Sequence, residues 1–412
     1  MVWDALKTSK KMKHSLSAIW LDIANAYGSV PHRLIFFALR RYGIPEKWID
    51  VIRKYYVGLW SKSFSGTDQS EWHLHLRGIF IGCTVSIILF LAAVNFLIEF
   101  VCRDYSCDDL TPMKAFMDDM FLMSDSIDQS KTLLDRCVTA LTWAGMDFRA
   151  SKSRSIVIFR GKLVEESPFT IKGERIPSIH ERPIRFLGRQ ISSTLNDSEM
   201  LNSVVSALDA HLLLLDSCSL VGFQKAWVLQ HLVLPRMRWL LQIYEFSISL
   251  VAKLEQKVSV YLRKWLNLHH SITSLALYSS ISPCPLPLSS LVSVFKSAKV
   301  SGHLLLRDSS DPFVAEANPP LKAGRWNVSE TVEQAESELN LAKITGKPNP
   351  GKAGLGLTLP SSLPRKGTKE YRKLISDIVL EFVEDADLAK AVQLSLQGSW
   401  VNWCDFIKTD VS

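Results

Sequence analysis

The sequence contains no Cys-x-x-Cys pair, and its seven cysteines are an odd number scattered along the chain. This pattern disfavours a zinc site built on paired cysteines and a complete disulfide framework, and it fits a reducing compartment. The first residues also lack a continuous apolar core followed by a small-residue cleavage site, so no secretory signal is predicted. We therefore expect an intracellular protein, in the nucleus or the cytoplasm.

Charged residues are missing from Gly78 to Ile98, a stretch long enough to cross a bilayer. Its first half is interrupted by Gly82, Thr84 and Ser86, which favours a polar glycine loop followed by a buried helix. A membrane span is the less favoured alternative, and we expect no membrane partner.

A phosphate-binding loop is lacking as well. The segment 346–353, GKPNPGKA, has Ala353 where a hydroxyl would hold magnesium, and no strand precedes it. We interpret residues 345–368 as a Pro/Gly-rich linker.

The chain has 412 residues, of which 47% are hydrophobic, and this predicts two or three folded domains. Strand and helix patterns alternate over residues 1–195, and helical patterns dominate residues 196–300 and 301–412. The net charge of +7 is compatible with a polyanionic partner.

Three acids end or interrupt apolar runs. LSAIWLDI, residues 16–23, reads as a central strand that closes on Asp22, and KAFMDDMFLMS, residues 114–124, reads as a hairpin with Asp118 and Asp119 at its tip. Neighbouring carboxylates resist joint ionisation, and a divalent metal would offset that cost. Acids at the ends of adjacent strands can share a two-metal site for phosphoryl displacement. For the acid pair alone, a solvated turn is the simpler interpretation.

The segment 251–266, VAKLEQKVSVYLRKWL, predicts a helix with an apolar face. Lys253, Lys257 and Lys264 fall on another face. They form either a solvated surface or a stripe that follows a nucleic-acid backbone.

Five ordered segments between about residues 15 and 192 together resemble the reverse transcriptases of LINE-type, non-LTR retrotransposons. They are LDIANAYGSVPH, RGIFIGCTVSIILF, FMDD, AGMDFRASKSRSIVI and PIRFLGRQI. The resemblance implies an α+β fold: a right-hand polymerase palm, with an antiparallel sheet and helices on one face. A helical thumb-like domain at 196–300 and a helical C-terminal region at 301–412 would follow.

The same resemblance implies roles for individual residues. Asp22, Asp118 and Asp119 would be the catalytic acids and would bind two Mg²⁺ ions, with Mn²⁺ as a substitute. Tyr27, Gly82 and Lys152 would contact the nucleotide. Gly188, together with Lys253, Lys257 and Lys264, would contact nucleic acid.

The implied function is RNA-directed DNA polymerase, with an RNA template, a DNA primer and dNTPs as partners; the oligomeric state stays open. The family's usual Gln, Lys and Asp are replaced by Ile81, Asn25 and Gly28. Only 21 residues precede Asp22, so we expect a fragment without complete fingers. The alternative is a catalytically incompetent palm–thumb remnant that only binds nucleic acid.

Overall fold

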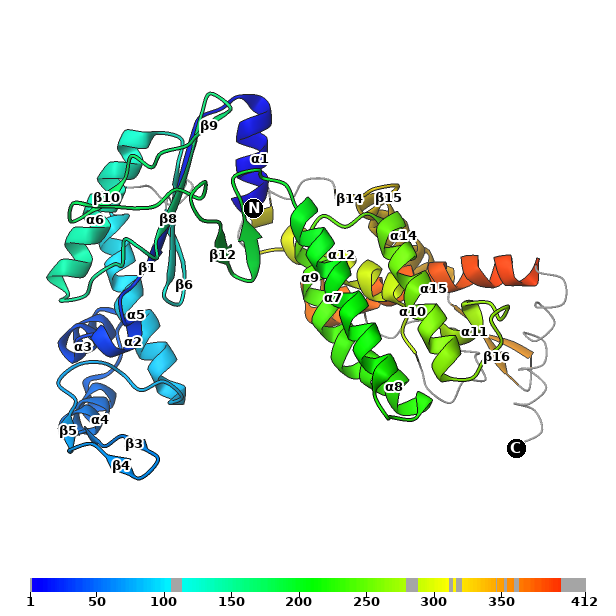
Figure 1. The fold of residues 1–412 in the computed structure, drawn as a ribbon, viewed down its shortest axis with the longest axis horizontal. Coiled ribbons are helices and arrows are strands. Elements are labelled where there is room, and N and C mark those ends of the chain that lie inside the picture. The colour runs from blue at the N-terminus through cyan, green and yellow to red at the C-terminus, as the bar shows by residue number, and fades with distance from the viewer. Residues whose placement is uncertain are drawn as a thin grey trace. The chain divides into compact units, whose positions relative to one another are not determined.

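Strand β1 (Leu16–Asp22) forms because its apolar residues are buried on both faces of a sheet, which favours a continuous apolar run. It is the middle strand of a five-stranded antiparallel sheet with the order β6-β7-β1-β8-β9 (Figure 1). The other strands are β6 (Met113–Phe116), β7 (Asp119–Ser124), β8 (Arg154–Phe159) and β9 (Lys162–Val164). The predicted central strand is therefore confirmed.

The computed structural model describes residues 2–104, 113–278, 288–310, 314–315, 321–345, 347–351, 354–358 and 363–393. The chain divides into two compact units, Val2–Leu195 and the residues from Asn196 onward. We call them the sheet unit and the helical unit. Their boundary coincides with the predicted end of the first domain at residue 195.

One face of the sheet packs against helices. Ile19 and Leu21 of β1 point into a core that also contains Leu122 of β7 and the buried sides of these helices. The helices of this part are α2 (Ala26–Ser29), α3 (His32–Arg41), α4 (Glu46–Tyr56), α5 (Thr84–Val101) and α6 (Ile127–Trp143). The fold is thus α+β with an antiparallel sheet, as expected.

The other face carries a further helix that the sequence analysis did not anticipate. Helix α1 (Val2–Met12) buries Trp3 and Leu6 against Ala18 and Trp20 of β1, so helices lie on both sides of the sheet (Figure 1). The apolar residues Val2, Trp3 and Leu6 of α1 lie on one side of the helix, an amphipathic pattern typical of a helix that packs on a sheet.

Short strands complete the sheet unit. They pair as two-stranded ladders and add no new layer. They are β2 (Trp60–Ser61) with β5 (His73–Leu74), β3 (Phe64–Ser65) with β4 (Asp68–Gln69), β10 (Thr170–Ile171) with β11 (Glu174–Arg175), and β12 (Ile184–Phe186) with β13 (Arg189–Ile191).

Helix α5 is the one described helix that is long and apolar enough to cross a membrane by length and composition. It lies in the apolar core of the sheet unit, in contact with α3 and α6. Phe90, Ala93 and Leu97 are buried in that core. The predicted helix is present, but it is buried on one side only, because Val85, Ile88 and Leu91 are exposed.

The helical unit has a single core. Its described helices are α7 (Ser198–Ser217), α8 (Gly222–Val228), the π-helix η1 (Leu229–Val233), α9 (Leu234–Ile243), α10 (Ile248–Trp265), α11 (Leu275–Tyr278), α12 (Leu291–Arg307), α14 (Val328–Thr345) and α15 (Lys369–Val392). Val258 of α10, Phe295 of α12 and Ile375 of α15 share one apolar cluster. The predicted boundary at 300/301 falls inside α12. Residues of this helix before and after the boundary pack into the same apolar cluster. The predicted division of this region into two domains is therefore not what the structure has.

The predicted linker at 345–368 contains regular structure where it is described. Strands β16 (Lys347–Gly351) and β17 (Gly354–Thr358) pair antiparallel. A small hairpin β14 (Lys322–Ala323) and β15 (Trp326–Asn327) precedes α14. Proline and glycine mark turns and edge strands as well as linkers, which is why composition alone suggested a linker here.

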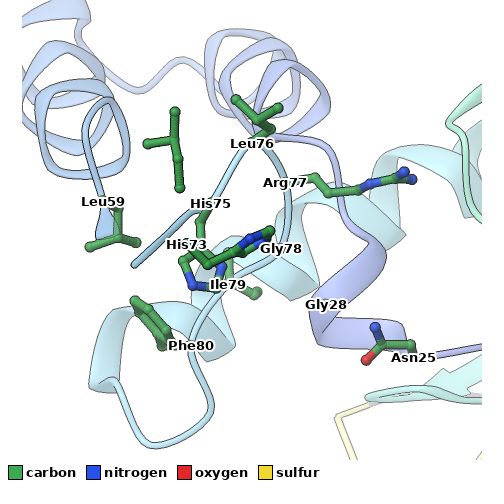
Figure 2. A pocket seen from close by; sticks show the side chains of 11 residues that line it. Asn25, Gly28, Leu59, His73, His75, Leu76, Arg77, Gly78, Ile79 and Phe80 are labelled. Atoms are coloured by element: carbon green, nitrogen blue, oxygen red, sulfur yellow. The ribbon is translucent and has the colours of Figure 1, made fainter. Parts of the chain in front are cut away.

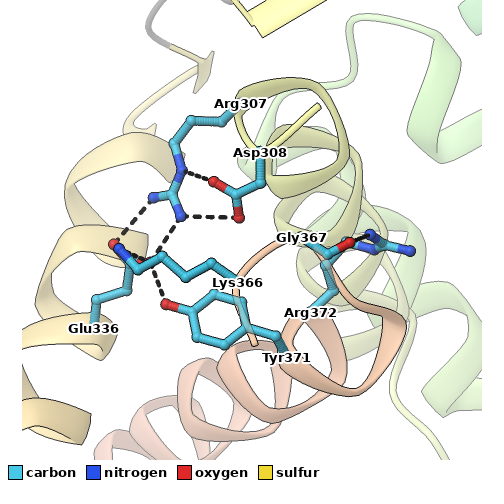
Figure 3. Close-up of polar contacts among 7 residues, drawn as sticks. All are labelled: Arg307, Asp308, Glu336, Lys366, Gly367, Tyr371 and Arg372. Carbon is cyan, nitrogen blue, oxygen red and sulfur yellow. Dashed lines mark hydrogen bonds and ion pairs between the residues drawn. The ribbon is translucent and has the colours of Figure 1, made fainter. Parts of the chain in front are cut away.

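A bidentate ion pair ties the C-terminal helices together. The Nη1 and Nη2 atoms of Arg307 lie 3.0 and 2.7 Å from the two carboxylate oxygens of Glu336 on α14. Tyr371 of α15 donates a hydrogen bond to the same carboxylate, and Lys366 lies 3.7 Å from it (Figure 3). Burial alone would raise the pKa of Glu336, but the hydrogen bonds from Arg307 and Tyr371 outweigh it and lower that pKa. We call these groups the Glu336 network.

Candidate active site

Strand pairing brings two of the predicted acids together. In the β1–β7 ladder Leu21 pairs with Met120, and Asp22 pairs with Asp119. Directly opposite residues in an antiparallel pair project from the same face, with Cβ atoms about 4.5–5.5 Å apart. Because side chains alternate along β1, this is also the face of Trp20. The predicted proximity of Asp22 to the hairpin is confirmed.

The third acid lies on the turn beside this pair. Phe116 pairs with Asp119, so Met117 and Asp118 form a two-residue turn between β6 and β7. Met117 has φ +57°, the left-handed conformation that tight hairpins require. Asp118 is exposed at the tip, and Asp119 is the first residue of β7. The hairpin is confirmed, with one acid in its turn and one in its strand.

The neighbouring carboxylates act on Asp119. Partial burial raises the pKa of Asp119, and the negative charges of Asp118 and Asp22 raise it further. No cationic side chain is among the causes of this shift. Among the residues that the structure describes, these acids therefore form a concentration of negative charge at Asp119.

Carboxylate oxygens are the ligands that hard divalent cations take. Across the described ranges, no three His, Cys, Asp or Glu side chains converge as a finished ligand group. The three acids are thus neighbours with the right donor chemistry and not a closed cage. The mutual repulsion at Asp119 is the kind of cost that a divalent cation removes. These residues fit the implied metal in donor type and in charge.

Lys152 lies in a loop that is fastened to Asp22. The backbone N–H of Asp22 donates to the Ser153 hydroxyl at 3.2 Å, and the N–H of Arg149 donates to the Asp22 carbonyl at 2.9 Å. Lys152 itself is exposed. The structure therefore brings this predicted nucleotide contact into the neighbourhood of the acids; its role stays a prediction.

The turn after β1 is joined to the glycine loop. The N–H of Ile79 donates to the Tyr27 carbonyl at 2.8 Å, and the N–H of Gly78 donates to the Val30 carbonyl at 2.8 Å. A Cβ atom on Gly78 would lie 2.8 Å from the carbonyl oxygen of Gly28. Gly28, which replaces the family's usual Asp, therefore lies at a close backbone approach.

The ring of Tyr27 is stacked on Phe90 of α5, with centroids 4.7 Å apart and planes inclined by 8°. It is half-buried against the core. Both interpretations of this residue, core packing and an exposed edge facing a nucleotide, are compatible with that position. Its role as a gate stays a prediction.

Gly82 has φ +94°, and a Cβ atom there would meet no other atom of the chain within 4 Å. The glycine is therefore required by backbone conformation and not by crowding within the protein. Gly188 occupies the turn between β12 and β13 with φ +84°, next to Leu187 with φ +46°. Two successive left-handed residues form a type I′ hairpin turn. Contacts of Gly82 and Gly188 with nucleic acid stay predictions.

The predicted lysine stripe on α10 is largely neutralised. Lys257 lies 2.8 Å from Asp209, and Lys264 lies 2.7 Å from Asp216; both acids belong to α7. For two of these three lysines, the interpretation as a solvated face therefore fits better than the interpretation as a phosphate-binding stripe. The partner acids come from another helix, so the pattern of α10 alone could not reveal them.

A pocket of about 430 Å³ that was not predicted from the sequence lies beside the first motif. Asn25 and Gly28 line one side, and His73, His75 and Arg77 line another (Figure 2). The ring of His75 is held by a 2.6 Å hydrogen bond between its Nε2 atom and the Ser61 hydroxyl. The alternating HLHLR at 73–77 was the signal that could have pointed to it.

Comparison with known proteins gives one family model and two curated relatives. Residues 1–191 match the family model described as reverse transcriptase (RNA-dependent DNA polymerase). Over 273 residues the chain is 24% identical to the Retrovirus-related Pol polyprotein from type-2 retrotransposable element R2DM of Drosophila melanogaster, covering 64% of this chain and 25% of that protein. Over 248 residues it is 26% identical to the corresponding type-1 element R2 polyprotein of Popillia japonica, covering 58% and 40%.

The chain therefore spans between 25% and 40% of the length of these curated relatives. Among solved structures, telomerase from Candida tropicalis, in a complex with a fragment of telomeric RNA, is similar with a TM-score of 0.36 and 13% identity, covering 76% of this chain and 51% of that chain. The Candida albicans telomerase gives 0.31 and 11%, covering 76% and 52%.

Proposed function

We propose that this chain, whose residues 1–191 form a reverse transcriptase domain of the non-LTR retrotransposon type, supplies the catalytic centre of an RNA-directed DNA polymerase. The observation that carries this proposal is the pairing of Asp22 with Asp119 at the ends of β1 and β7. Asp118 lies in the adjoining turn, as a third carboxylate next to this pair. The relatives are much longer, and we propose that the chain corresponds to one part of such a polyprotein.

The acids would bind two Mg²⁺ ions, or Mn²⁺ in their place. Bound in this way, divalent ions lower the pKa of a primer 3′-hydroxyl and offset the charge on the pyrophosphate that leaves. Asp22 and Asp119 project from one face of the sheet, so a primer end and a dNTP held over that face would meet both. The carboxylates would hold the metal ions and so orient the primer end and the dNTP. No proton transfer by the carboxylates is required.

Lys152 is proposed to act on the leaving group. Its Nζ carries a positive charge and three donors, and its loop is hydrogen-bonded to the backbone of Asp22. A lysine in this position stabilises pyrophosphate and can donate a proton to it.

Tyr27 is proposed to select the sugar. The stacked Phe90 ring restricts where the Tyr27 ring can move. A fixed ring beside the sugar would collide with a 2′-hydroxyl, the group that distinguishes ribonucleotides from dNTPs. The glycine loop, with Gly82 at φ +94°, would let backbone and template approach closely.

A second candidate is a remnant that binds nucleic acid without polymerising. Ile81, at the position where the family usually has Gln, is 87% exposed, so a large apolar side chain faces solvent in the loop that should contact template and nucleotide. An isoleucine offers no hydrogen bond there. This observation favours impaired nucleotide contacts and leaves the acids intact.

The test uses the full chain with an RNA template, a DNA primer and dNTPs, in Mg²⁺ or Mn²⁺. Asp119→Asn is compared with Asp125→Asn, the same chemical change beyond the other end of β7. Loss of several kcal/mol of charge stabilisation predicts at least about a hundredfold slower extension for Asp119→Asn only.

Mn²⁺ binding, followed by electron paramagnetic resonance, gives a readout besides activity. Weaker Mn²⁺ binding and slower extension in Asp119→Asn, with Asp125→Asn unchanged, would support the polymerase. Metal binding at the acids without extension by the unmodified chain would favour the remnant. Equal extension by both variants would exclude these acids as the catalytic centre.

A further inference from the structure

A group of basic side chains collects at the end of β1 that is opposite to Asp22. The last turn of α1 and the turn that follows it carry three lysines, and the β8–β9 turn carries two more basic residues. We call this group the basic end of the sheet; its members are Lys10, Lys11, Lys13, Arg160 and Lys162.

Backbone contacts hold the two segments together. The N–H of Gly161 donates to the His14 carbonyl at 3.1 Å, and the N–H of Arg160 donates to the Ser15 hydroxyl at 3.1 Å. A Cβ atom on Gly161 would lie 2.8 Å from the Cα of Lys13, and Gly161 has φ +79°. The basic residues of both segments are therefore fixed beside one another by the fold.

These five side chains are exposed, in contrast with the lysines of α10. Lys257 and Lys264 are neutralised by Asp209 and Asp216. None of the five members of the basic end is joined to an acid by an ion pair within the described part of the chain. Uncompensated like charges repel, so the group is costly unless an anion binds there.

The surroundings offer room and shape for such an anion. A pocket of about 270 Å³ is lined by Lys7, Thr8, Lys10, Lys11, Thr194 and Leu195, so two residues of the basic end border one hollow beside α1. Beside Arg160, the ring of Phe159 is 49% exposed, with the guanidinium carbon 5.3 Å from its centroid. Cations beside an exposed ring are typical of surfaces that bind nucleic acid.

Helix α1, which carries Lys10 and Lys11, lies on the face of the sheet to which Asp22 projects. The helix packs on Trp20, and alternation along β1 directs Asp22 to the face of Trp20. Lys162 pairs with Phe159 and projects from the opposite face. The six residue steps from Leu16 to Asp22 span about 20 Å at about 3.3 Å each. At about 3.4 Å per base pair, this is about six base pairs of a duplex.

We propose that the basic end binds backbone phosphates of the template–primer duplex, about six base pairs from the primer terminus held at the acids. This inference rests on the proposed polymerase function. It assigns to α1 and the β8–β9 turn a second contact that positions the duplex, because phosphate contacts fix register without reading sequence.

The experiment measures binding of hairpin-closed RNA–DNA duplexes to the full chain by fluorescence anisotropy over a range of salt. The first variant is Lys10→Gln/Lys11→Gln/Lys13→Gln, and the second is Arg160→Gln/Lys162→Gln. The matched control, Lys253→Gln/Lys257→Gln/Lys264→Gln, removes as many charges as the first variant from α10. Circular dichroism checks that each variant is folded.

For a duplex of about 14 base pairs, the slope of log affinity against log salt should become shallower by about 0.9 for each phosphate that the variant no longer neutralises. That is up to about 2.7 for the first variant and about 1.8 for the second, with little change in the control. A duplex of about four base pairs, too short to reach the basic end, should bind the first variant and the unmodified chain equally.

Equal slopes for the control and the first variant would overturn the inference. The loss of net charge, and not the loss of this surface, would then explain the change in slope. An undiminished effect on the short duplex would overturn it as well. Tighter binding of the unmodified chain to anionic lipid vesicles than to the duplex, abolished in the first variant, would assign the surface to a membrane instead. Failure of the proposed function is distinct: Asp119→Asn would leave extension unchanged whatever the slopes are.

Discussion

The two units of the chain place a carboxylate in opposite electrostatic environments. In the sheet unit, Asp119 lies beside Asp22 and Asp118, and partial burial and these like charges raise its pKa. In the helical unit, Glu336 accepts hydrogen bonds from Arg307 and Tyr371, and these bonds lower the pKa of Glu336 despite its burial. The first arrangement leaves charge for something outside the protein to neutralise, and the second neutralises it within the fold.

The comparison separates two uses of the same functional group. A carboxylate that is satisfied by its neighbours stabilises the helices that carry them. A carboxylate that is surrounded by other carboxylates destabilises the apo protein slightly and gains its role when a cation or substrate arrives. Each of the following predictions would break or sharpen this division.

The largest expected effect is on activity in the sheet unit. Asp22→Asn should slow primer extension at least about a hundredfold, because several kcal/mol of charge stabilisation disappear. Unfolding of the sheet unit should hardly change, which hydrogen exchange of peptides from β1 and β7 measures. A destabilised β1 in this variant would mean that Asp22 is structural, contrary to the division.

The next effect is on stability in the helical unit. Arg307→Met should destabilise α12, α14 and α15 by about 2–3 kcal/mol, because Glu336 and Asp308 lose a bidentate partner in a partly buried place. Hydrogen exchange of peptides from these helices gives the local free energy of opening. Lys390→Met, which breaks the exposed pair with Asp387, is the control and should change it by less than about 1 kcal/mol.

Lowering the pH should destabilise the helical unit through Glu336 and stabilise the sheet unit through Asp119. The pKa of Glu336 is lowered from 4.5, so its contribution is present above 4.5 and is lost as the pH falls below that value. The pKa of Asp119 is raised from 3.8, so the folded state is favoured at low pH and loses stability as the pH rises above 3.8.

Two variants measure these signs. Glu336→Gln should lower stability at pH 7, and Asp119→Asn should raise it at pH 7, the latter by less than about 1 kcal/mol because Asp119 is exposed. Both differences should shrink as the pH is brought down toward 4. Differences of the same sign at pH 7 would show that the two carboxylates are not opposed.

The smallest effect concerns the α10 lysines. Lys257→Gln breaks an exposed pair with Asp209 and should change stability by less than about 1 kcal/mol. Its effect on duplex binding should be negligible in anisotropy measurements at moderate salt. A large loss of binding would restore the stripe as a nucleic-acid surface and weaken the comparison with the basic end of the sheet.

Sequence patterns were sufficient wherever neighbouring residues decide structure. The apolar run before Asp22 predicts β1, and the acids in an apolar hairpin predict the β6–β7 turn. Ser126, a residue type that favours helix N-caps, caps α6, with its side chain accepting from the N–H of Gln129. In each case hydrophobic alternation, turn chemistry or capping is read over a few adjacent residues.

Patterns failed where distant segments decide. Asp209 and Asp216 neutralise two lysines of α10 from a helix 48 residues away in each case. Helix α12 passes through the predicted boundary at 300/301, because α9, α10, α14 and α15 all pack around it. Neither the ion pairs of the α10 lysines nor the packing around α12 can be predicted from the sequence next to these residues.

The sequence by itself identified the three acids that are proposed to carry the chemistry. Asp22, Asp118 and Asp119 end or interrupt apolar strands, and that is a local property. Only the tertiary structure decided that Asp22 pairs with Asp119 and that both share a face with α1, because strand register is set by side-chain packing between segments far apart in the chain. The same long-range packing brought the segment of Lys13 beside that of Arg160 and so formed the basic end of the sheet.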